Sequence, residues 1–307
     1  MLQQTRVETV IPYYMRFLAE VPSIRDLAEV DDDRLHKLWE GLGYYSRARN
    51  LRRAAQIVVA EHGGVFPDSY EKILTLPGIG PYTAGAIASI CFDAPTPAVD
   101  GNVLRVAARI AASDMDITST TARKDVTAAL ARIYPQKNRG AFTQSLMELG
   151  ATICVPNGAP KCGECPCEKI CAARARGETT RYPVKQPKKN RTERDITVLL
   201  LTCGGKIALR KRPPKGLLAN MWEFPNVPGA LDATEALDAA KKIGLSPLRV
   251  THTRQKKHVF THVTWHMTAH EISCACEADA EKNLTWVTKE ELAERYGLPT
   301  AFRQFLS

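Results

Sequence analysis

Four cysteines stand close together in the second half of the chain, which has 307 residues: Cys154, Cys162, Cys165 and Cys171. Their spacing, C-x7-C-x2-C-x5-C, gives a compact four-thiolate set that suits either zinc or an iron–sulfur cluster, and spacing alone does not separate the two. Cys167 lies in the same loop and is interpreted most simply as a non-ligand. Disulfides and free thiols are the alternatives to a metal site. An odd total of nine cysteines, with five crowded together, favours a metal centre in a reducing compartment.

A second group of residues combines a glycine turn with a carboxylate. Gly78 and Gly80, in the segment LPGIG, precede a small-residue helix expected over 83–90, and such a turn presents successive backbone N–H groups to a phosphate. A proline-containing break then brings Asp100 to the start of the next expected helix, 103–112. A carboxylate at a helix start is stabilised as its anion. A plain tight turn and an ordinary N-cap are the alternative interpretations.

The net charge predicts a polyanionic partner. The chain carries 42 Lys and Arg against 33 Asp and Glu, a net charge of +9, which favours nucleic acid or an anionic membrane. No run approaches the roughly 18 apolar residues of a membrane span, and the N-terminus lacks the apolar core of a signal peptide. We therefore expect a soluble, intracellular protein. The segment GLGYYSRARNLRRA, residues 41–54, sets two tyrosines among arginines, which indicates either a nucleic-acid surface or a solvated helix face.

Hydrophobic periodicity separates two regions of the chain. From Val7 to Gly150 apolar residues recur at helical spacing, interrupted by loops. Residues 172–195 are rich in Arg, Lys and Pro without an apolar period, which is typical of an exposed basic linker. From Ile196 the pattern changes to short β-branched runs, with helices expected over Leu231–Ile243 and Lys289–Tyr296. The second region is therefore predicted to mix α and β structure.

The stretch HVFTHVTWHMTAHEI, residues 258–272, alternates between apolar and polar residues and predicts a strand. Its four histidines share one parity, so they are expected on one strand face. A metal site is disfavoured there, because residues spaced along one strand do not converge on a point.

The order of these motifs resembles a known family. LPGIGPYTAG, VDGNV, MELGA and the four-cysteine loop, in this order, are similar to the iron–sulfur branch of the helix-hairpin-helix DNA glycosylase superfamily. Endonuclease III-like members carry a lysine nucleophile two positions beyond the second hairpin glycine, where this chain has Tyr82. Without that lysine no Schiff base forms from this position. MutY-type adenine DNA glycosylases are favoured instead, because MLQQT, GLGYYSRARN and the extra C-terminal domain also resemble them. The resemblance covers essentially the whole chain.

The resemblance implies a mainly α N-terminal domain, with the helix-hairpin-helix glycosylase fold and an iron–sulfur cluster loop, followed by an α+β, Nudix-like C-terminal domain. The expected divisions are residues 1–153 for the glycosylase domain, 154–171 for the cluster loop, 172–195 for the basic linker and 196–307 for a Nudix-like lesion-recognition domain.

The resemblance also implies roles for single residues. Asp100 matches a carboxylate that faces the cationic sugar formed as the base departs, where a fixed negative charge stabilises the oxocarbenium-like transition state. Asn102 and Tyr82 match neighbours that hydrogen-bond around the same sugar and carboxylate, and Glu148 matches an acidic residue near the base pocket. The residues expected at the DNA are Gln3, Gln4, Tyr44, Arg47, Arg49, Gly78, Gly80 and Lys161. Among these, Gln4 and Tyr44 enter the duplex beside the lesion while the adenine is flipped out.

In the C-terminal domain the family's Phe-Ser-His loop examines 8-oxoguanine opposite the adenine, and it corresponds here to Phe260, Thr261 and His262. Threonine replaces serine, so the hydroxyl is kept and a methyl group is added. The acidic signature of active Nudix hydrolases is absent from the sequence, so the domain is expected to bind rather than cleave. A second departure is the seven-residue gap between Cys154 and Cys162, one residue longer than in much of the family.

The function implied is that of an adenine DNA glycosylase of base excision repair, a monofunctional hydrolase that removes adenine mispaired with 8-oxoguanine or guanine. The expected cofactor is one 4Fe-4S cluster, with zinc as the alternative. The expected partner is double-stranded DNA containing a purine mismatch, bound by a monomer at the nucleoid of a bacterial cytoplasm. An endonuclease III-like glycosylase/lyase and a non-cleaving mismatch-binding protein are the alternatives.

The family's general acid is a glutamate just upstream of the MLQQT motif, with which this sequence begins. The chain as written is therefore expected to be nearly inactive, because general acid catalysis is worth roughly 10² to 10⁴ in rate. A start codon assigned too far downstream, a gene fragment and a protein that binds lesions without cleaving are the three explanations.

Overall fold

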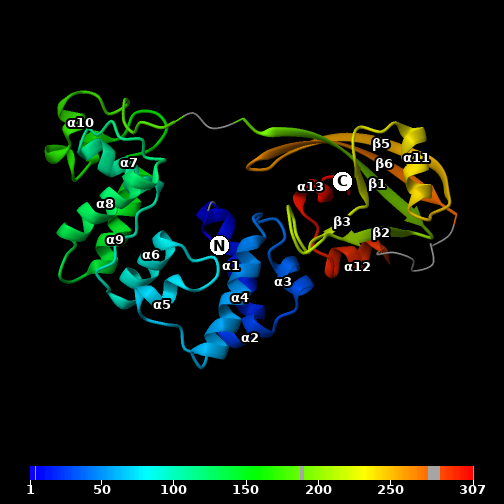
Figure 1. The fold of residues 1–307 in the computed structure, drawn as a ribbon, viewed down its shortest axis with the longest axis horizontal. Helices are drawn as coiled ribbons and strands as arrows, with labels where there is room; N and C mark the ends of the chain where they lie inside the picture. The colour runs from blue at the N-terminus through cyan, green and yellow to red at the C-terminus, as the bar shows by residue number, and fades with distance from the viewer. Residues whose placement is uncertain (4, 187–189, 276–283, 307) are drawn as a thin grey trace. The chain divides into compact units, whose positions relative to one another are not determined.

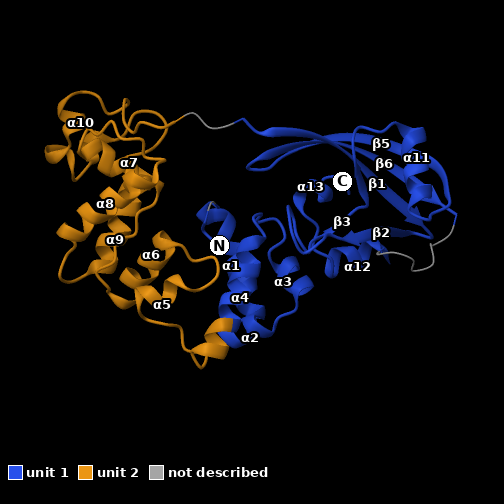
Figure 2. Cartoon of the chain, viewed as in Figure 1, with its two compact units in different colours: residues 1–56, 189–307 blue, residues 57–188 orange. Residues whose placement is uncertain are grey.

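The chain folds into two compact units (Figure 2). The structure is a computed structural model that describes residues 1–306 except Gln4, 187–189 and 276–283. Unit 1 comprises residues 1–56 and 189–307, and unit 2 comprises residues 57–188. Across the described residues, no helix combines the length and the apolar character that crossing a bilayer requires.

Helices form the first part of the chain, and a sheet with helices forms the second (Figure 1). The first helices are α1 (Val7–Glu20), α2 (Ile24–Glu29), α3 (Asp32–Leu38), α4 (Ser46–Glu61), α5 (Tyr70–Leu74), α6 (Pro81–Phe92), α7 (Gly101–Ile110), α8 (Thr120–Ile133), α9 (Arg139–Glu148), a π-helical turn (Leu149–Ile153) and α10 (Ala172–Ala175). The strands are β1 (Thr192–Cys203), β2 (Lys206–Lys211), β3 (Trp222–Glu223), β4 (Asn226–Pro228), β5 (Pro247–Val259), β6 (Val263–Cys274) and β7 (Leu284–Val287), with helices α11 (Ala233–Lys242), α12 (Lys289–Glu294) and α13 (Thr300–Arg303). The predicted fold class, mainly α followed by α+β, is confirmed.

Local sequence explains where the helices of unit 2 begin. α5, α7 and α8 each follow a side chain that accepts hydrogen bonds from first-turn N–H groups: Ser69, Asp100 and Ser119. Gly85 lets α6 pack tightly, because a Cβ there would lie 2.5 Å from the carbonyl oxygen of Pro97. The helices predicted after the glycine turn and after Asp100 are therefore confirmed as α6 and α7.

The segment predicted as an exposed linker, residues 172–195, is structured at both ends. Its first residues form α10, and Ala173 and Tyr182 are buried with Ala112. At its other end, Thr192 already belongs to β1. The composition of the segment conceals these anchors, because single buried side chains carry no periodic signal.

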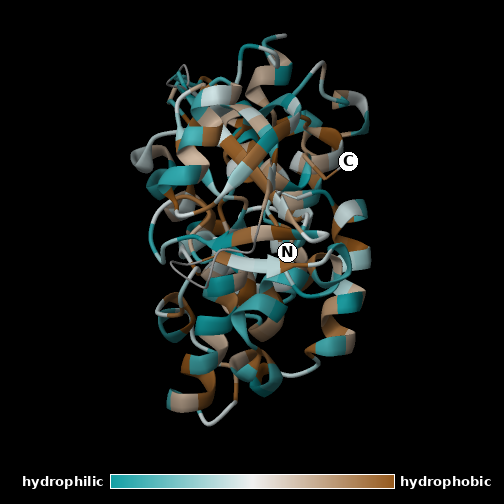
Figure 3. Cartoon of the chain, turned by 90° about the vertical axis from the view of Figure 1, so that its right-hand side faces the viewer, coloured by the Kyte–Doolittle hydropathy of each residue, from teal (hydrophilic) through white to brown (hydrophobic). Residues whose placement is uncertain are grey.

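The sheet of unit 1 is mixed and covered on both faces. Its main path runs β3-β2-β1-β6-β5, with β4 beside β1 and β7 beside β2. β1 and β6 are parallel, and the other pairs are antiparallel. One face packs against α12 and α13 through Leu292 and Phe302, and the other packs against α11 through Ala236 and Ala240. Figure 3 shows apolar and polar residues along the same helices, as amphipathic elements require.

The alternating stretch at residues 258–272 forms a hairpin, so the prediction of a single strand is wrong. β5 and β6 flank a turn at residues 260–262. His258 pairs with Trp265 across the hairpin, whereas His266 lies on the other face. The register pairs even-numbered with odd-numbered residues, so the turn moves the histidines to different faces while the sequence alternation continues.

The helices α1 to α4 share a core with the loop between β2 and β3. Met221, at the end of this loop, is fully buried in one hydrophobic cluster with Phe17 and Trp39. Arg49 of α4 donates a hydrogen bond to the carbonyl oxygen of Ala219, in the same loop, at 3.0 Å. The loop therefore joins the first four helices to the sheet within unit 1.

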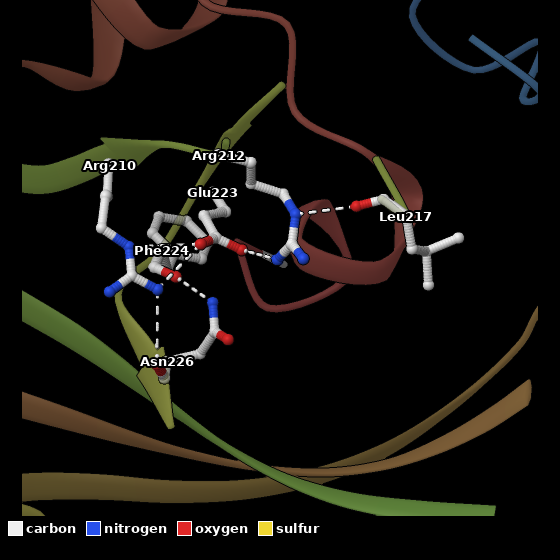
Figure 4. Close-up of polar contacts among 6 residues, drawn as sticks. All are labelled: Arg210, Arg212, Leu217, Glu223, Phe224 and Asn226. Carbon is white, nitrogen blue, oxygen red and sulfur yellow. Dashed lines mark hydrogen bonds and ion pairs between the residues drawn. The ribbon is translucent and has the colours of Figure 1, made fainter. Parts of the chain in front are cut away.

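A buried carboxylate fixes this loop at its base, as Figure 4 shows. Glu223 is 1% exposed and pairs with Arg210 at 2.9 Å and with Arg212. Arg212 also donates to the carbonyl oxygen of Leu217 at 3.0 Å. A carboxylate removed from water needs such charged donors, because an unpaired buried charge is strongly destabilising. These bonds hold the loop of residues 212–221 to the sheet.

His36 on α3 is a buried histidine whose ring nitrogens have no hydrogen-bond partner among the described residues. Burial, followed by the positive charge of Arg49, lowers its pKa from the ordinary 6.5 to about 4. The folded protein therefore holds His36 neutral at pH 7.

We expect the stability of the protein to fall between pH 7 and pH 4 because of this histidine. The unfolded chain gains a proton at His36 near pH 6.5 and the folded chain only near pH 4, so falling pH favours the unfolded state across this window. The contribution to the free energy of unfolding is up to about 3 kcal/mol. Urea unfolding at pH 7 and pH 4.5 measures it, with His36→Phe as the comparison. An equal pH dependence in His36→Phe would contradict the assignment.

Candidate active site and cysteine pocket

Asp100 stands at the N-terminus of α7 with a partly exposed carboxylate. Its Oδ1 accepts hydrogen bonds from the backbone N–H groups of Asn102 and Val103, both at 2.8 Å. Its Oδ2 accepts one from the side-chain amide of Asn102 at 3.1 Å. The N-cap and the catalytic interpretations are compatible, because the bonds that cap the helix also fix the direction of the carboxylate.

The predicted phosphate cradle lies in the turn between α5 and α6. Gly78 has a φ of +79°, a conformation that favours glycine, and the N–H of Ile79 closes the turn on the carbonyl oxygen of Leu76 at 3.1 Å. Gly80 precedes α6, and a Cβ built on it would meet no atom within 4 Å. Both glycines are exposed, so this backbone is open to an approaching phosphate.

Tyr82 and Glu148 have different surroundings. Tyr82 donates to the sulfur of Met147 at 3.7 Å, and burial, followed by the negative charge of Asp100, raises its pKa. Glu148 ends α9 with an exposed side chain, and no described residue donates a hydrogen bond to its carboxylate. The structure thus brings Asn102 into hydrogen-bond contact with Asp100 and places Tyr82 where the charge of Asp100 acts on it, while the role of Glu148 stays a prediction.

Arg105, which was not predicted as a site residue, joins the surroundings of Asp100 to the cysteine loop. It is 4% exposed. Its Nη2 donates to Oδ1 of Asn102 at 2.8 Å and to the carbonyl oxygen of Gly150 at 2.6 Å, and its Nε donates to the carbonyl oxygen of Cys154 at 2.8 Å. Because Arg105 occupies the amide oxygen of Asn102, the amide NH₂ group is left to face Asp100.

Gly150 allows the closest approach to Asn102. A Cβ on Gly150 would lie 2.6 Å from the Cβ of Asn102. We expect Gly150→Ala to displace Asn102 and to lower the free energy of unfolding by about 1–3 kcal/mol. Chemical denaturation measures the change, with Gly163→Ala as the control because a Cβ there meets no atom within 4 Å. Equal stability of the two variants would argue against this packing.

The four predicted metal ligands line one pocket in unit 2. Cys154, Cys162, Cys165 and Cys171 line this pocket, with Cys167 also in its wall. Burial and the neighbouring thiols raise the pKa of Cys167. Within the described part of the chain, no three Cys, His, Asp or Glu side chains are grouped so that they could hold one metal ion. The thiols therefore line a shared space and do not meet at a point.

Arg109, one turn after Arg105 on α7, also supports the cysteine pocket. It is 3% exposed, and its Nη1 donates to Sγ of Cys154 at 3.2 Å and to the carbonyl oxygen of Val155 at 3.0 Å. Its Nε donates to the carbonyl oxygen of Tyr182 at 3.0 Å. Arg109 therefore ties the first cysteine of the pocket and the backbone after it to α7.

In unit 1, Tyr44 contacts the turn of residues 260–262. Tyr44 is the residue predicted to enter the duplex and is called the wedge below, and the turn, predicted to examine 8-oxoguanine, is called the lesion loop. Tyr44 has a φ of +48°, which is strained for a residue with a side chain, and it is 51% exposed. Its hydroxyl lies 3.4 Å from the hydroxyl of Thr261. Thr261 and His262 are exposed at the turn between β5 and β6.

Phe260, the first residue of this turn, is partly buried and anchors it. Its ring packs edge-on against His258 and Trp265, with ring centres 4.5 Å and 4.8 Å apart. The N–H of Thr192 on β1 donates to the carbonyl oxygen of His262 at 3.1 Å. The turn is therefore held from both sides while its tip stays open.

Of the other residues predicted to contact DNA, some form hydrogen bonds within the protein and others are exposed. Arg47 donates to the carbonyl oxygen of Met1 at 2.6 Å and lies over the ring of Tyr44 at 5.7 Å, while Arg49 is held by the β2–β3 loop. Gln3 and Lys161 are exposed. Gln4 lies outside the described residues. Contacts of these residues with DNA remain predictions.

Both parts of the chain match family models. Residues 1–135 match the HhH-GPD superfamily base excision DNA repair protein, and residues 197–307 match the NUDIX domain. The adenine DNA glycosylase of Mus musculus is 35% identical over 343 residues, which cover 95% of this chain and 66% of the relative. That of Buchnera aphidicola subsp. Schizaphis graminum (strain Sg) is 32% identical over 283 residues, which cover 92% of this chain and 80% of the relative. The chain belongs to the adenine DNA glycosylase family.

The motif-based resemblance to adenine DNA glycosylases is thereby confirmed. The chain spans slightly less than two thirds of the length of the mouse relative, at 66%. A solved structure of a thermostable thymine-DNA glycosylase is similar over 57% of this chain and 80% of that chain, with a TM-score of 0.52 and 26% identity. This likeness is consistent with the helical fold that carries Asp100 and the cysteine pocket.

Proposed function

We propose that the chain is an adenine DNA glycosylase that hydrolyses the N-glycosidic bond of adenine mispaired with 8-oxoguanine or guanine in duplex DNA. The observation that carries the proposal is the carboxylate of Asp100, fixed in direction by three hydrogen bonds at the start of α7. Membership of the adenine DNA glycosylase family supports the reaction class.

Asp100 acts on the charge that develops as the base leaves. Positive charge grows on the sugar, and a carboxylate already oriented beside it lowers the free energy of the transition state. Asn102 holds the carboxylate and Arg105 holds Asn102, so little reorganisation accompanies the reaction. Tyr82 stands where the lyase branch has its lysine, so water and not an amine attacks the sugar.

DNA is held through its backbone at the hairpin and through its bases elsewhere. The N–H groups at Gly78 and Gly80 bind one phosphate without reading sequence. Tyr44 enters the base stack beside the lesion, which keeps the adenine flipped out. Thr261 and His262 read 8-oxoguanine through a hydroxyl and an imidazole, both of which donate and accept hydrogen bonds.

The cofactor that fits the cysteine pocket is one 4Fe-4S cluster, held by Cys154, Cys162, Cys165 and Cys171. The four thiols line one pocket without converging on a point, an arrangement that suits a group of several atoms, whereas zinc holds its sulfurs at about 2.3 Å. Bound there, the cluster would cross-link the loop. Its role would be structural, because hydrolysis of a glycosidic bond involves no electron transfer. Arg105 and Arg109 of α7 both donate hydrogen bonds to Cys154, so they connect the loop to this helix.

The domain organisation proposed is a glycosylase domain at residues 1–153, a cluster loop at 154–171, a linker at 172–195 and a lesion-recognition domain at 196–307. The family models at residues 1–135 and 197–307 support its two ends. We propose that a monomer acts on double-stranded DNA.

The test is release of free adenine from a duplex with a single 8-oxoguanine·adenine pair, followed by chromatography under single-turnover conditions. We expect slow release from this duplex and from a guanine·adenine duplex, because the chain as written is expected to be nearly inactive, and no release from a fully paired one. Borohydride should trap no covalent complex, because Tyr82 provides no amine. Trapping would favour the lyase alternative, and binding without release would favour a mismatch-binding protein.

The cofactor has its own test. Protein purified without oxygen should carry about four iron atoms per chain and a broad absorption near 400 nm, as thiolate-bound iron–sulfur clusters do. A colourless protein with one zinc ion would contradict the cluster. Cys154→Ser should lower the iron content, whereas Cys203→Ser, outside the pocket, should not.

A further inference from the structure

We infer that Asp33 is a positioning residue for lesion recognition, because it holds the Tyr44 wedge at the Thr261 turn. The inference rests on the proposed function, which gives the wedge and the turn their places at DNA. Tyr44 lies in the loop between α3 and α4, and Thr261 lies in the turn between β5 and β6. The contact between their hydroxyls at 3.4 Å therefore depends on how the first four helices and the sheet are joined within unit 1.

Asp33 makes the polar centre of this joint. Its Oδ1 accepts a hydrogen bond from the indole N–H of Trp222 at 3.0 Å and pairs with the ammonium group of Lys211 at 2.9 Å. Lys211 also lies 5.2 Å from the centre of the Trp222 ring. The ion pair is exposed and contributes little. The bond to Trp222, which is 9% exposed, is directional and fixes α3 against β3.

A second joint stands at the other end of α3. Glu40, two residues after the helix ends, accepts a hydrogen bond from the backbone N–H of Leu298 at 2.9 Å and from the ammonium group of Lys37 at 2.8 Å. A single hydrogen bond lets two bodies pivot, whereas two bonds at opposite ends of one helix fix its orientation. Tyr44 lies four residues after Glu40 in the chain, so the position of its side chain depends on how α3 is oriented.

The loop between β2 and β3 completes the support. Glu223 pairs with Arg212 (Figure 4). Met221, at the end of the loop between β2 and β3, is buried with the core of α1 to α4. Trp222 therefore sits between a residue anchored in the helical core and a carboxylate anchored in the sheet. This fixes the indole N–H in the direction of Asp33 before any DNA is bound.

The consequence is that wedge and lesion loop approach DNA at a fixed separation. Ordering flexible groups on binding costs free energy, and a pre-arranged pair avoids this cost. Discrimination between 8-oxoguanine and guanine needs the Thr261 hydroxyl at one place while Tyr44 occupies the neighbouring step. Loosening Asp33 should therefore weaken discrimination more than it weakens binding itself.

The experiment measures dissociation constants by fluorescence anisotropy for duplexes with 8-oxoguanine or guanine opposite 2′-fluoro-2′-deoxyadenosine, whose fluorine disfavours the cationic sugar and so blocks cleavage. The readout is the ratio of the two constants. We expect Asp33→Ala to reduce this ratio about tenfold. Asp33→Asn keeps an oxygen acceptor for Trp222 and should keep the ratio. Affinity for a fully paired duplex should not change in either variant.

Two further variants keep the test decisive. Glu29→Ala, at an exposed carboxylate of α2 outside this joint, is the matched control and should behave as the unchanged chain. Trp222→Phe removes the indole N–H that donates to Asp33, so it should reduce the ratio of dissociation constants as Asp33→Ala does. This variant replaces Asp33→Ala in the test if that variant does not fold. An undiminished ratio in both would overturn the inference. No discrimination by the unchanged chain would instead contradict the proposed function.

Discussion

Asp100→Asn is expected to lower the rate of adenine release by about 10²- to 10³-fold, the usual cost of removing one preorganised electrostatic group. Asparagine keeps an oxygen that can accept from the N–H groups of Asn102 and Val103, so the start of α7 should persist. The negative charge that faces the developing cation is lost. Single-turnover release from an 8-oxoguanine·adenine duplex measures the effect.

Binding and folding separate this prediction from a structural defect. Affinity for the uncleaved duplex should change little, because the hairpin and the wedge do not involve Asp100. The matched control is Asp125→Asn, an exposed carboxylate on α8, which should release adenine as the unchanged chain does. Full activity in Asp100→Asn would remove Asp100 from the mechanism.

Arg105→Ala is expected to cost about 3 kcal/mol of the free energy of unfolding or more. It strips a donor from the amide oxygen of Asn102 and from the carbonyl oxygens of Gly150 and Cys154 in a largely buried site, and each buried acceptor left unpaired costs about 1–3 kcal/mol. Adenine release should fall as well, since the amide of Asn102 is then free to turn away from Asp100. Urea unfolding and single-turnover release measure the two effects.

The conservative and the distant controls sharpen this test. Arg105→Lys offers one ammonium group in place of a planar fork, so it should recover only part of the loss. Arg132→Ala, at an exposed arginine of α8, should leave both stability and release unchanged. An Arg105→Ala variant as stable as the Arg132→Ala control would show that these bonds do not support the fold.

The elements that could be predicted from the sequence are those with a local signal, such as a regular spacing of apolar residues or a recognisable helix start. α7, α11 and α12 were predictable because each begins after a capping side chain, and α6 because small residues follow a glycine turn and a proline stands in its first turn. The hairpin at residues 258–272 was predicted as one strand because alternation says nothing about which face a strand takes after a turn. Tyr182 was placed in an exposed linker because one buried ring has no period.

The candidate site was predictable where function demands short motifs. The hairpin glycines, Asp100 and the cysteines stand in short motifs, and the order of these motifs along the chain indicates the family, while their roles stay predictions. Arg105 and Arg109 depend on carbonyl groups about 45 residues or more away, which no local pattern contains. The signal available was two arginines four positions apart in the apolar helix VLRVAARIAA, where a charged side chain must find internal partners.

The surface that we propose to read the lesion is assembled from both ends of the chain, since Tyr44 comes from residues 1–56 and Thr261 from residues 189–307. No single cut in the gene can therefore isolate it. A fragment that starts in the linker would lose the partner of Trp222 and would expose Met221, an apolar side chain with no water contact in the whole protein. Such a fragment should aggregate, and co-expression with residues 1–56 should restore its solubility.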